Sequence, residues 1–302
     1  MRLRLCIIGI VWLAASAVRA EEFDADRAFG YLKQICDIGP RISGTEGMEK
    51  QQVLLREHFE KLGAKVQTQE FDVPHPLNGR PVRMRNLIVS WHPESTQRVL
   101  LACHYDTRPF PDQEPLPQNR QLPFIGANDG ASGCALFMEL AHQMQGRKTP
   151  LGIDFVFFDG EELVYSARDK YFWGSEHFAQ RYRDAPPPHK YVAGVLVDMV
   201  GDRNLEIYIE RMSARYAPQV TDSLFKVARE LKIPEFVARK RHEVRDDHIP
   251  LNQIARIPTC DLIDFDYPHW HTRNDIPAAC SGESLQKVGR VLLAWMDRYT
   301  GA

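Results

Sequence analysis

The chain has 302 residues, of which 44% are hydrophobic and 26% charged, as in an ordinary globular protein. Its formal net charge of −2 gives no electrostatic reason to expect binding to nucleic acid or to an anionic membrane. A chain of this length can bury one sizeable core, so we expect a single domain over residues 21–302.

Residues 1–20 have the pattern of a secretory signal peptide. Arg2 and Arg4 precede an apolar run over residues 5–17, and small residues flank Arg19 where a signal peptidase would cleave. The run is too short to cross a bilayer, and no later run is long enough. We therefore expect a secreted or periplasmic product with no membrane span.

Strand and helix patterns alternate along the rest of the chain. Apolar residues recur at helical spacing in residues 26–37 and 46–62, and alternation predicts strands at 65–71 and 85–91. The continuous apolar run 99–103 predicts a central strand covered on both faces. Further strands are expected at 153–158, 193–197, 205–209 and 257–263, and further helices through Leu136 to Met144, near 175–183, and at 218–231 and 285–299. This order predicts an α/β fold with a mixed, mostly parallel, twisted central sheet flanked by helices.

Polar side chains follow the expected strands at the point where each strand ends. The apolar run 155–158 stops at Asp159-Gly160 and delivers Glu161 and Glu162. An isolated Glu-Glu pair is most often a solvated turn. However, His104 and Asp106 follow another strand, and Asp198 a third. Open α/β sheets keep their sites at this edge, and neighbouring residues there point in different directions. One glutamate can therefore bind a metal while the other moves protons.

Two more residues complete the set. Asp129 opens a helix that begins with small residues, and His271 stands in Pro268-His-Trp-His-Thr272. Imidazoles and carboxylates together fit a zinc site with N and O ligands rather than thiolates. Such a set with one unligated carboxylate suits hydrolysis or acyl transfer, in which the metal polarises a carbonyl and the spare carboxylate carries a proton.

These strand-end residues resemble those of the zinc-dependent aminopeptidases of the phosphorylase/hydrolase-like fold, and the similarity runs from about residue 27 to the C-terminus. Four segments narrow the resemblance to the glutaminyl cyclases of animal type and their bacterial relatives. The segments are 157–162, Trp173-Gly-Ser175, Asp246-Asp-His-Ile-Pro250 and Trp270-His-Thr272. The implied reaction converts an N-terminal glutamine of a peptide or protein to pyroglutamate and releases ammonia.

The resemblance also implies a role for each site residue. It implies one zinc ion, bound by Asp129, Glu162 and His271, and Glu161 as the general acid and base. Asp198 would anchor the α-amine of the substrate, with Asp246 as its hydrogen-bonded partner. Trp270 would form a wall of the pocket and donate from its indole N–H.

Two alternatives remain open. In the aminopeptidases, His104 and Asp198 would bind a second zinc ion, with Asp129 bridging the pair, and the enzyme would hydrolyse N-terminal residues from peptides. Both residues are present, although Trp270 and the 246–250 segment favour the cyclase. A metal-free binding protein of the same fold would show eroded ligands, and none of the key positions is lost.

The resemblance further implies a disulfide between Cys103 and Cys134, where the animal cyclases have one. Cleavage of the leader leaves five of the six cysteines, so Cys36, Cys260 and Cys280 stay unassigned. At two positions the chain departs from the cyclases. Ala167 stands where they have a tryptophan, and Asp261 where they have a histidine behind the zinc ligands.

Two further features are interpreted as structural. His248, in the 246–250 segment, is taken as a structural or supporting residue rather than a catalytic one. The charge run Arg239-Lys240-Arg241 is interpreted as a solvated surface, because the chain has no overall basic character.

Overall fold

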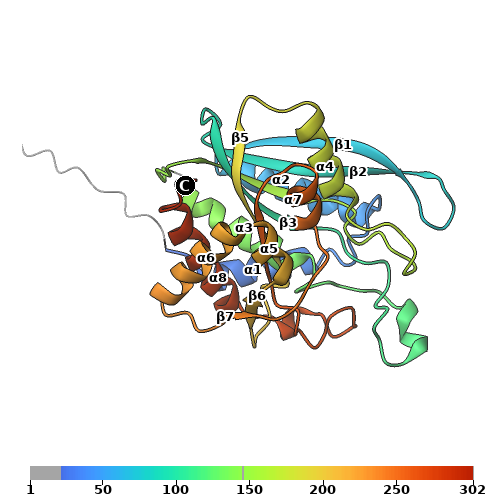
Figure 1. Ribbon diagram of the computed structural model, residues 1–302. Helices are drawn as coiled ribbons and strands as arrows, with labels where there is room; N and C mark the ends of the chain where they lie inside the picture. Colours follow the sequence, from blue (N-terminus) through green and yellow to red (C-terminus); the bar gives the residue numbers. More distant parts are fainter. Residues whose placement is uncertain (1–21, 145, 302) are drawn as a thin grey trace, which may run out of the picture.

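The computed structural model describes residues 22–144 and 146–301 (Figure 1). At its centre is a six-stranded sheet in the order β1-β2-β4-β3-β5-β8. Strands β4, β3, β5 and β8 are parallel, and β1 and β2 are antiparallel to their neighbours. The bounds are β1 Lys65–Pro74, β2 Pro81–Trp91, β3 Gln97–His104, β4 Gly152–Phe158, β5 Lys190–Asp198 and β8 Thr259–Ile263. The predicted mixed α/β sheet is confirmed.

Alternate residues of the central strands face opposite sides of the sheet. On β3, Val99, Leu101 and Cys103 belong to the larger core cluster, whereas Leu100 and Ala102 belong to the smaller one on the opposite face. Every residue of β4 is buried. A strand covered on both faces has no polar side to show, which explains why the sequence reads as a continuous apolar run.

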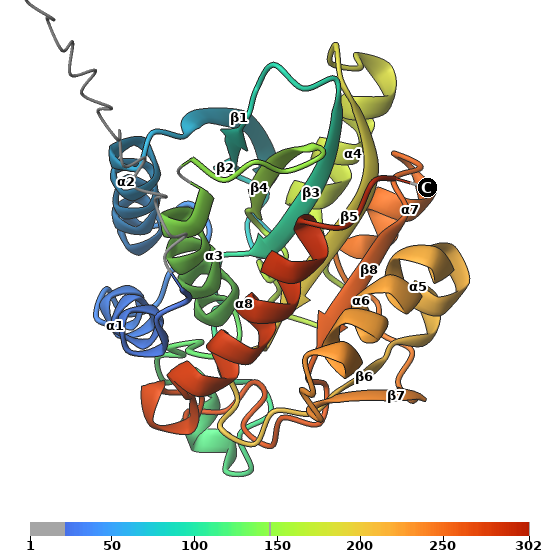
Figure 2. The same ribbon diagram turned by 90° about the vertical axis from the view of Figure 1, so that its left-hand side faces the viewer.

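Helices cover both faces of this sheet. Figure 2 shows α1, α2, α3 and α8 together on one side of the sheet, and residues of α6 join the same core cluster. On the other face, α4 and α7 contribute Phe178 and Leu251 to the smaller cluster. The bounds are α1 Ala25–Cys36, α2 Glu46–Lys61, α3 Ala131–Met144, α4 Trp173–Asp184, α6 Pro218–Glu230, α7 His248–Gln253 and α8 Gly282–Met296.

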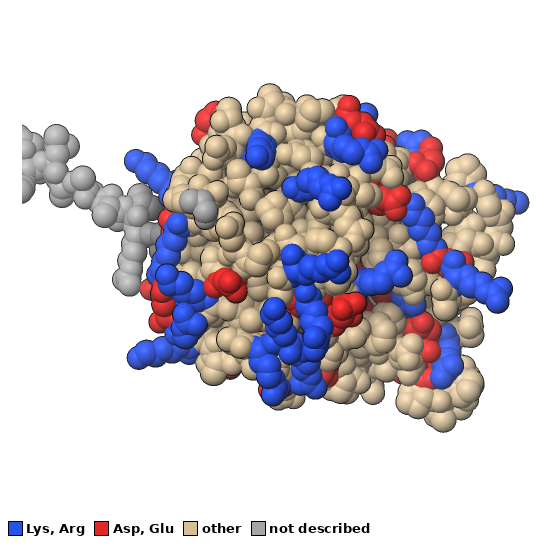
Figure 3. Space-filling model, in the orientation of Figure 1, with Lys and Arg blue, Asp and Glu red and all other residues tan. Residues whose placement is uncertain are grey.

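A small ribbon lies outside the main sheet. The strand expected at 205–209 is the short β6 (Ile207–Ile209), which pairs with β7 (Phe236–Lys240) in a separate two-stranded sheet. Helix α5 (Arg211–Tyr216) follows β6 directly. Sequence patterns did not predict α5, α7 or β7, because each spans only one or two turns or a mostly exposed strand. On the face drawn in Figure 3, Lys and Arg side chains gather over α5 and β7.

A buried ion pair joins two central strands. The Arg98 guanidinium on β3 contacts the Asp154 carboxylate on β4 at 2.6 Å, and both side chains are 1% exposed. Arg98 also donates to backbone carbonyls of residues 91, 92 and 153, and the Tyr191 hydroxyl donates to Asp154. The pair is therefore fully satisfied by hydrogen bonds.

We expect Arg98→Met to lower the free energy of unfolding by about 3–5 kcal/mol, because it leaves the Asp154 charge buried without its partner. Denaturant unfolding followed by circular dichroism measures this. Arg83→Met is the control, since the ion pair of Arg83 with Asp72, between β2 and β1, is exposed, and this variant should unfold like the parent chain. Equal midpoints for the two variants would contradict the expectation.

The predicted Cys103–Cys134 disulfide is wrong for this structure. The two Sγ atoms lie 4.0 Å apart, about twice the length of a disulfide bond, and both cysteines are buried free thiols. The Cys134 thiol instead donates to the backbone carbonyl of Gly130, one turn earlier. The remaining cysteines of the described residues, Cys36, Cys260 and Cys280, are buried free thiols too.

The leader predicted at residues 1–20 lies outside the described residues. Within the described ranges, none of the helices has both the length and the apolar character that crossing a bilayer requires.

Candidate metal and proton-transfer site

The C-terminal ends of the parallel strands surround a cavity of about 420 Å³. The cavity is lined by all but one of the residues to which the resemblance assigns a role. They are Asp129, Glu161, Glu162, Asp198, Asp246, Trp270 and His271. The exception, His104, is buried at the end of β3 and contacts two of these residues from below. Residues that are far apart in the sequence therefore meet at one edge of the sheet.

Asp129, Glu162 and His271 form one group. The His271 Nε2 atom lies 2.9 Å from Glu162 Oε1 and 3.5 Å from Asp129 Oδ2, and all three side chains are buried. Their ligand atoms lie within 4.8 Å of one another. Asp129 Oδ2 is buried and has no hydrogen-bond partner, which is costly unless a cation completes its environment. One imidazole nitrogen and two carboxylates in this arrangement fit a zinc ion.

The Glu162 carboxylate is held from two sides. Arg108 donates to it through its backbone N–H (3.0 Å) and its guanidinium (3.1 Å). Burial alone would raise the pKa of Glu162, but the charges of His271 and Arg108 outweigh it and hold the pKa at about 2. Glu162 is therefore an anion at any physiological pH, as a metal ligand must be.

His271 is oriented by a residue that sequence reasoning did not identify. The Asp112 carboxylate lies 2.9 Å from His271 Nδ1, on the side of the ring that faces away from Glu162. The Trp270 ring stacks on the imidazole with centroids 3.9 Å apart. Carboxylate contacts of this kind fix the tautomer and orientation of a metal-binding histidine.

We expect Asp112→Asn to weaken zinc binding by about 10- to 100-fold, because the amide keeps the shape of the carboxylate but not its charge. Titration with a competing chelator measures the dissociation constant. Asp184→Asn, which removes an exposed carboxylate at the end of α4, is the control. An unchanged constant in Asp112→Asn would exclude this role.

The Asp129 loop is fixed by Asp275 and by the close approach of Gly130. The backbone N–H groups of Asn128 and Asp129 donate to the Asp275 carboxylate at 2.7 and 3.1 Å. At Gly130 (φ 95°), a Cβ atom would lie 2.6 Å from the Asp106 carbonyl oxygen, so no other residue fits without a shift. Neither Asp275 nor Asp112 directly follows a strand, so the strand-end pattern that identified the other acids could not identify these two.

A second group shares Asp129 with the first. His104 Nε2 lies 3.2 Å from Asp129 Oδ1 and 3.2 Å from Asp198 Oδ1. The ligand atoms of these three residues also lie within 4.8 Å of one another. Asp129 thus has one oxygen toward each group, as the two-metal alternative requires.

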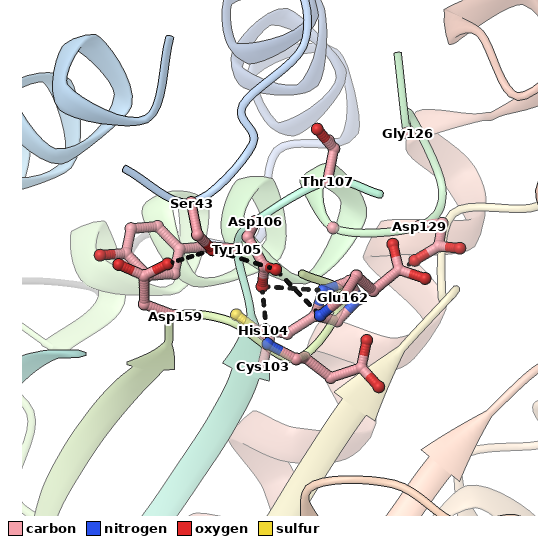
Figure 4. A network of polar contacts seen from close by, with 12 residues as sticks. Ser43, Cys103, His104, Tyr105, Asp106, Thr107, Gly126, Asp129, Asp159 and Glu162 are labelled. Carbon is pink, nitrogen blue, oxygen red and sulfur yellow. Dashed lines mark hydrogen bonds and ion pairs between the residues drawn. The ribbon is translucent and has the colours of Figure 1, made fainter. Parts of the chain in front are cut away.

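Asp106 holds the two glutamates in place from behind the site. Its carboxylate accepts hydrogen bonds from the backbone N–H groups of Glu161 (3.1 Å) and Glu162 (2.9 Å). Figure 4 shows Asp106 between Ser43 and His104, with the Ser43 hydroxyl reaching both Asp106 and Asp159. The turn after β4 is therefore fixed by a buried network, and the side chains of both glutamates line the cavity.

Glu161 is the half-buried member of the glutamate pair. Burial and the neighbouring Glu162 charge raise the pKa of Glu161 well above its usual range. The pKa of Glu162 is lowered, so the pKa values of these two adjacent carboxyl groups are shifted in opposite directions. Such a pair is the usual sign of one group that binds charge and another that exchanges a proton.

The remaining predicted residues also lie at the cavity. Asp198 is at the end of β5, and its charge, after burial, is the largest influence that raises the pKa of Asp246. Ala167 lines the wall where the cyclases have a tryptophan, and Tyr171 and Phe172 line the cavity beside it. His248 is fully buried, 3.5 Å from Glu210 and 3.7 Å from Asp261, outside the cavity wall.

Comparisons with known proteins agree with this geometry. Residues 86–296 match peptidase family M28. The chain belongs to peptidase family M28. A solved structure of Fimbriiglobus ruber glutaminyl cyclase is 45% identical, with a TM-score of 0.89 over 95% of this chain and 99% of that one.

Two other relatives share most of the chain. A solved leucine aminopeptidase precursor from Bacteroides thetaiotaomicron is 32% identical, with a TM-score of 0.87 over 94% of this chain and all of that one (100%). The glutaminyl-peptide cyclotransferase-like protein of Mus musculus is 27% identical over 99% of this chain and 82% of its own length.

Proposed function

We propose that the protein is a zinc-dependent glutaminyl-peptide cyclotransferase, which converts an N-terminal glutamine to pyroglutamate and releases ammonia. The single observation that carries this proposal is the placement of the glutamate pair: Glu162 lies 2.9 Å from His271 in the group that also contains Asp129, whereas Glu161 lines the cavity outside that group. The likeness to a glutaminyl cyclase at 45% identity over nearly the whole chain supports it.

The zinc ion would be bound by Asp129, Glu162 and His271, and when bound it polarises the γ-amide carbonyl of the glutamine. Glu161 takes a proton from the α-amine as that nitrogen attacks the γ-carbon. The new C–N bond closes the five-membered ring, and Glu161 returns the proton to the departing amide nitrogen, which leaves as ammonia. Because nucleophile and electrophile belong to one residue, positioning contributes much of the rate and no activated water is needed.

Asp198 and Asp246 provide the negative charge that receives the α-amine. Both line the cavity, and burial together with the charge of Asp198 raises the pKa of Asp246. The raised pKa of Asp246 favours its protonated form, which can donate a hydrogen bond within this pair of carboxyl groups. Trp270 closes the adjacent wall and packs on His271, which keeps water from that side of the site.

One observation favours a second candidate function. His104, Asp129 and Asp198 are placed to bind a second metal ion, as a two-zinc aminopeptidase needs. In that enzyme Asp198 would be a ligand and would no longer be available to receive the amine.

One experiment separates the two functions. The zinc-loaded protein is incubated with a Gln-peptide and with a Leu-peptide, and ammonia, free amino acid and zinc per chain are measured. We expect ammonia from the Gln-peptide, no free leucine, and one zinc ion per chain. Free leucine with two zinc ions per chain would establish the aminopeptidase instead.

We also propose that the protein acts outside the cytoplasm on peptide or protein N-termini, because residues 1–20 have the leader pattern. The N-terminal sequence of the protein recovered from its native host tests this, and a mature chain that begins at residue 21 or 22 is expected.

A further inference from the structure

We propose that a basic strip beside the cavity binds acidic residues of the substrate peptide, a few positions after its N-terminal glutamine. The strip consists of Arg211, Arg215, Arg239, Lys240, Arg241 and Arg245. This inference rests on the proposed function, since it assumes that a peptide N-terminus occupies the cavity. It assigns a substrate class, peptides with an acidic segment, to a surface that the sequence alone suggested was only solvated.

A row of ring contacts leads from the cavity to the strip. Trp270, on the cavity wall, contacts Phe265 (5.6 Å between centroids), and Phe265 contacts His242 at 5.5 Å. His242 in turn contacts Tyr208 at 6.4 Å. Phe265 is 37% exposed, unusually open for a phenylalanine that also lines the cavity. The row therefore leads from the cavity wall through the exposed Phe265 to Tyr208, which is buried beneath the outer end of the row.

The outer end of this row holds two guanidinium groups in fixed positions. The Arg239 and Arg241 guanidiniums lie over the Tyr208 ring, 5.2 and 4.7 Å from its centroid. Arg211 donates from its Nε atom to the Arg241 carbonyl at 2.7 Å. Guanidiniums that are already positioned lose less conformational entropy when they bind a carboxylate, for which their planar fork is well suited.

Most of the positive charge of the strip is not neutralised by the protein. All six side chains belong to exposed residues. Among the described residues, Arg241 forms a salt bridge with Asp266 (3.0 Å), and the other five have no ion pair. Glu243 is the one acid within residues 239–245, and Arg245 lines the cavity directly. Figure 3 shows this gathering of basic side chains over α5 and β7.

The cavity and the strip together present opposite charges in a fixed order. The cavity contains Glu161, Asp198 and Asp246, which suit a cationic N-terminus, and the strip outside suits anions. Three ring-to-ring steps of 5.6, 5.5 and 6.4 Å separate Trp270 from Tyr208, and an extended peptide at about 3.3 Å per residue would cover that path in about five residues. A peptide with an N-terminal amine and acidic residues along that path matches both.

The test compares three Gln-hexapeptides that differ only at positions three to five, with glutamate, alanine or lysine there, at low and at physiological ionic strength. At low salt we expect kcat/KM for the glutamate peptide to exceed that for the lysine peptide by about tenfold or more. The difference should lie in KM rather than in kcat. At physiological ionic strength the two kcat/KM values should become more similar, because salt screens the charges. Equal values for the three peptides at low salt would overturn the proposal.

A charge-reversed variant locates the effect. Arg239→Glu combined with Arg215→Glu, two strip residues that do not line the cavity, should invert the preference and leave the turnover of the dipeptide Gln-Ala unchanged. Lys61→Glu combined with Lys65→Glu is the matched control, because it makes the same change of charge at exposed residues of α2 and of the edge strand β1, outside the strip. The same loss of preference in both double variants would show that net charge, and not the strip, is responsible.

Failure of the proposed function is distinguishable from failure of the strip. If Gln-Ala is not turned over, the cyclase proposal is wrong, and the strip is then tested by fluorescence anisotropy of the same three labelled hexapeptides. Tighter binding of the glutamate peptide, lost in Arg239→Glu/Arg215→Glu, supports the strip. Equal binding of the three peptides refutes it.

Discussion

Glu161→Gln should lower kcat by about 10²- to 10⁴-fold while zinc binding is retained, because the amide has the shape of the carboxyl group but cannot exchange its proton. Glu161 is the one glutamate of the pair that remains outside the Asp129, Glu162 and His271 group, and burial and Glu162 raise its pKa. Steady-state ammonia release with a Gln-peptide, together with zinc per chain, measures both quantities.

The matched control for this variant is Glu243→Gln. Glu243 also lines the cavity, but it is exposed and contacts none of the groups that bind the metal. It should keep kcat near that of the parent enzyme. If Glu161→Gln loses its zinc, Glu161 is a ligand and the roles of the two glutamates must be exchanged. A kcat within a few-fold of the parent value would remove Glu161 from proton transfer altogether.

His271→Ala should abolish zinc binding and with it the activity. It deletes the only nitrogen ligand of the proposed group and leaves Glu162 and Asp129 as two buried anions side by side. We expect zinc affinity to fall by more than the roughly 100-fold that loss of a supporting contact costs, and kcat/KM to fall by about a thousandfold or more. Metal analysis after dialysis and ammonia release give the two readouts.

His269→Ala, two residues earlier in the same loop, separates ligation from loop damage. His269 packs against Tyr267 and is not part of any metal-binding group among the described residues. It should keep both zinc and activity. A His271→Ala protein with one zinc per chain and normal turnover would refute the proposed ligand set.

The sequence predicted the sheet and most of the cavity because buried parallel strands leave a clear pattern. Residues 99–103 and 153–158 are apolar without interruption, so their ends, and the acids and histidine at those ends, could be located. The roles of Glu161, Glu162 and His271 came from a family resemblance, and the structure places these side chains together. The apolar pattern of the strands was therefore sufficient to locate the site residues along the chain, whereas their chemical roles came from the family resemblance.

The residues that support the site could not be located in this way. Asp112 and Arg108 lie in an irregular proline-rich loop, and Asp275 lies in another loop after β8. Nothing in their local sequence distinguishes them from solvated charges, since their contacts are made only by tertiary folding. The disulfide was wrong for a related reason: adjacency of Cys103 and Cys134 was implied correctly, but bonding depends on side-chain rotation, which spacing does not determine.

The sharing of Asp106 between two successive amide groups has a mechanical consequence. Because the Asp106 carboxylate accepts hydrogen bonds from the backbone N–H groups of both Glu161 and Glu162, the positions of the proton carrier and of the metal ligand depend on the same residue. Loss of the Asp106 carboxylate would free the backbone of both glutamates at once, so metal binding and proton transfer should be impaired together. A new reaction on this scaffold that needs one glutamate in a different position would therefore require a change at Asp106 first.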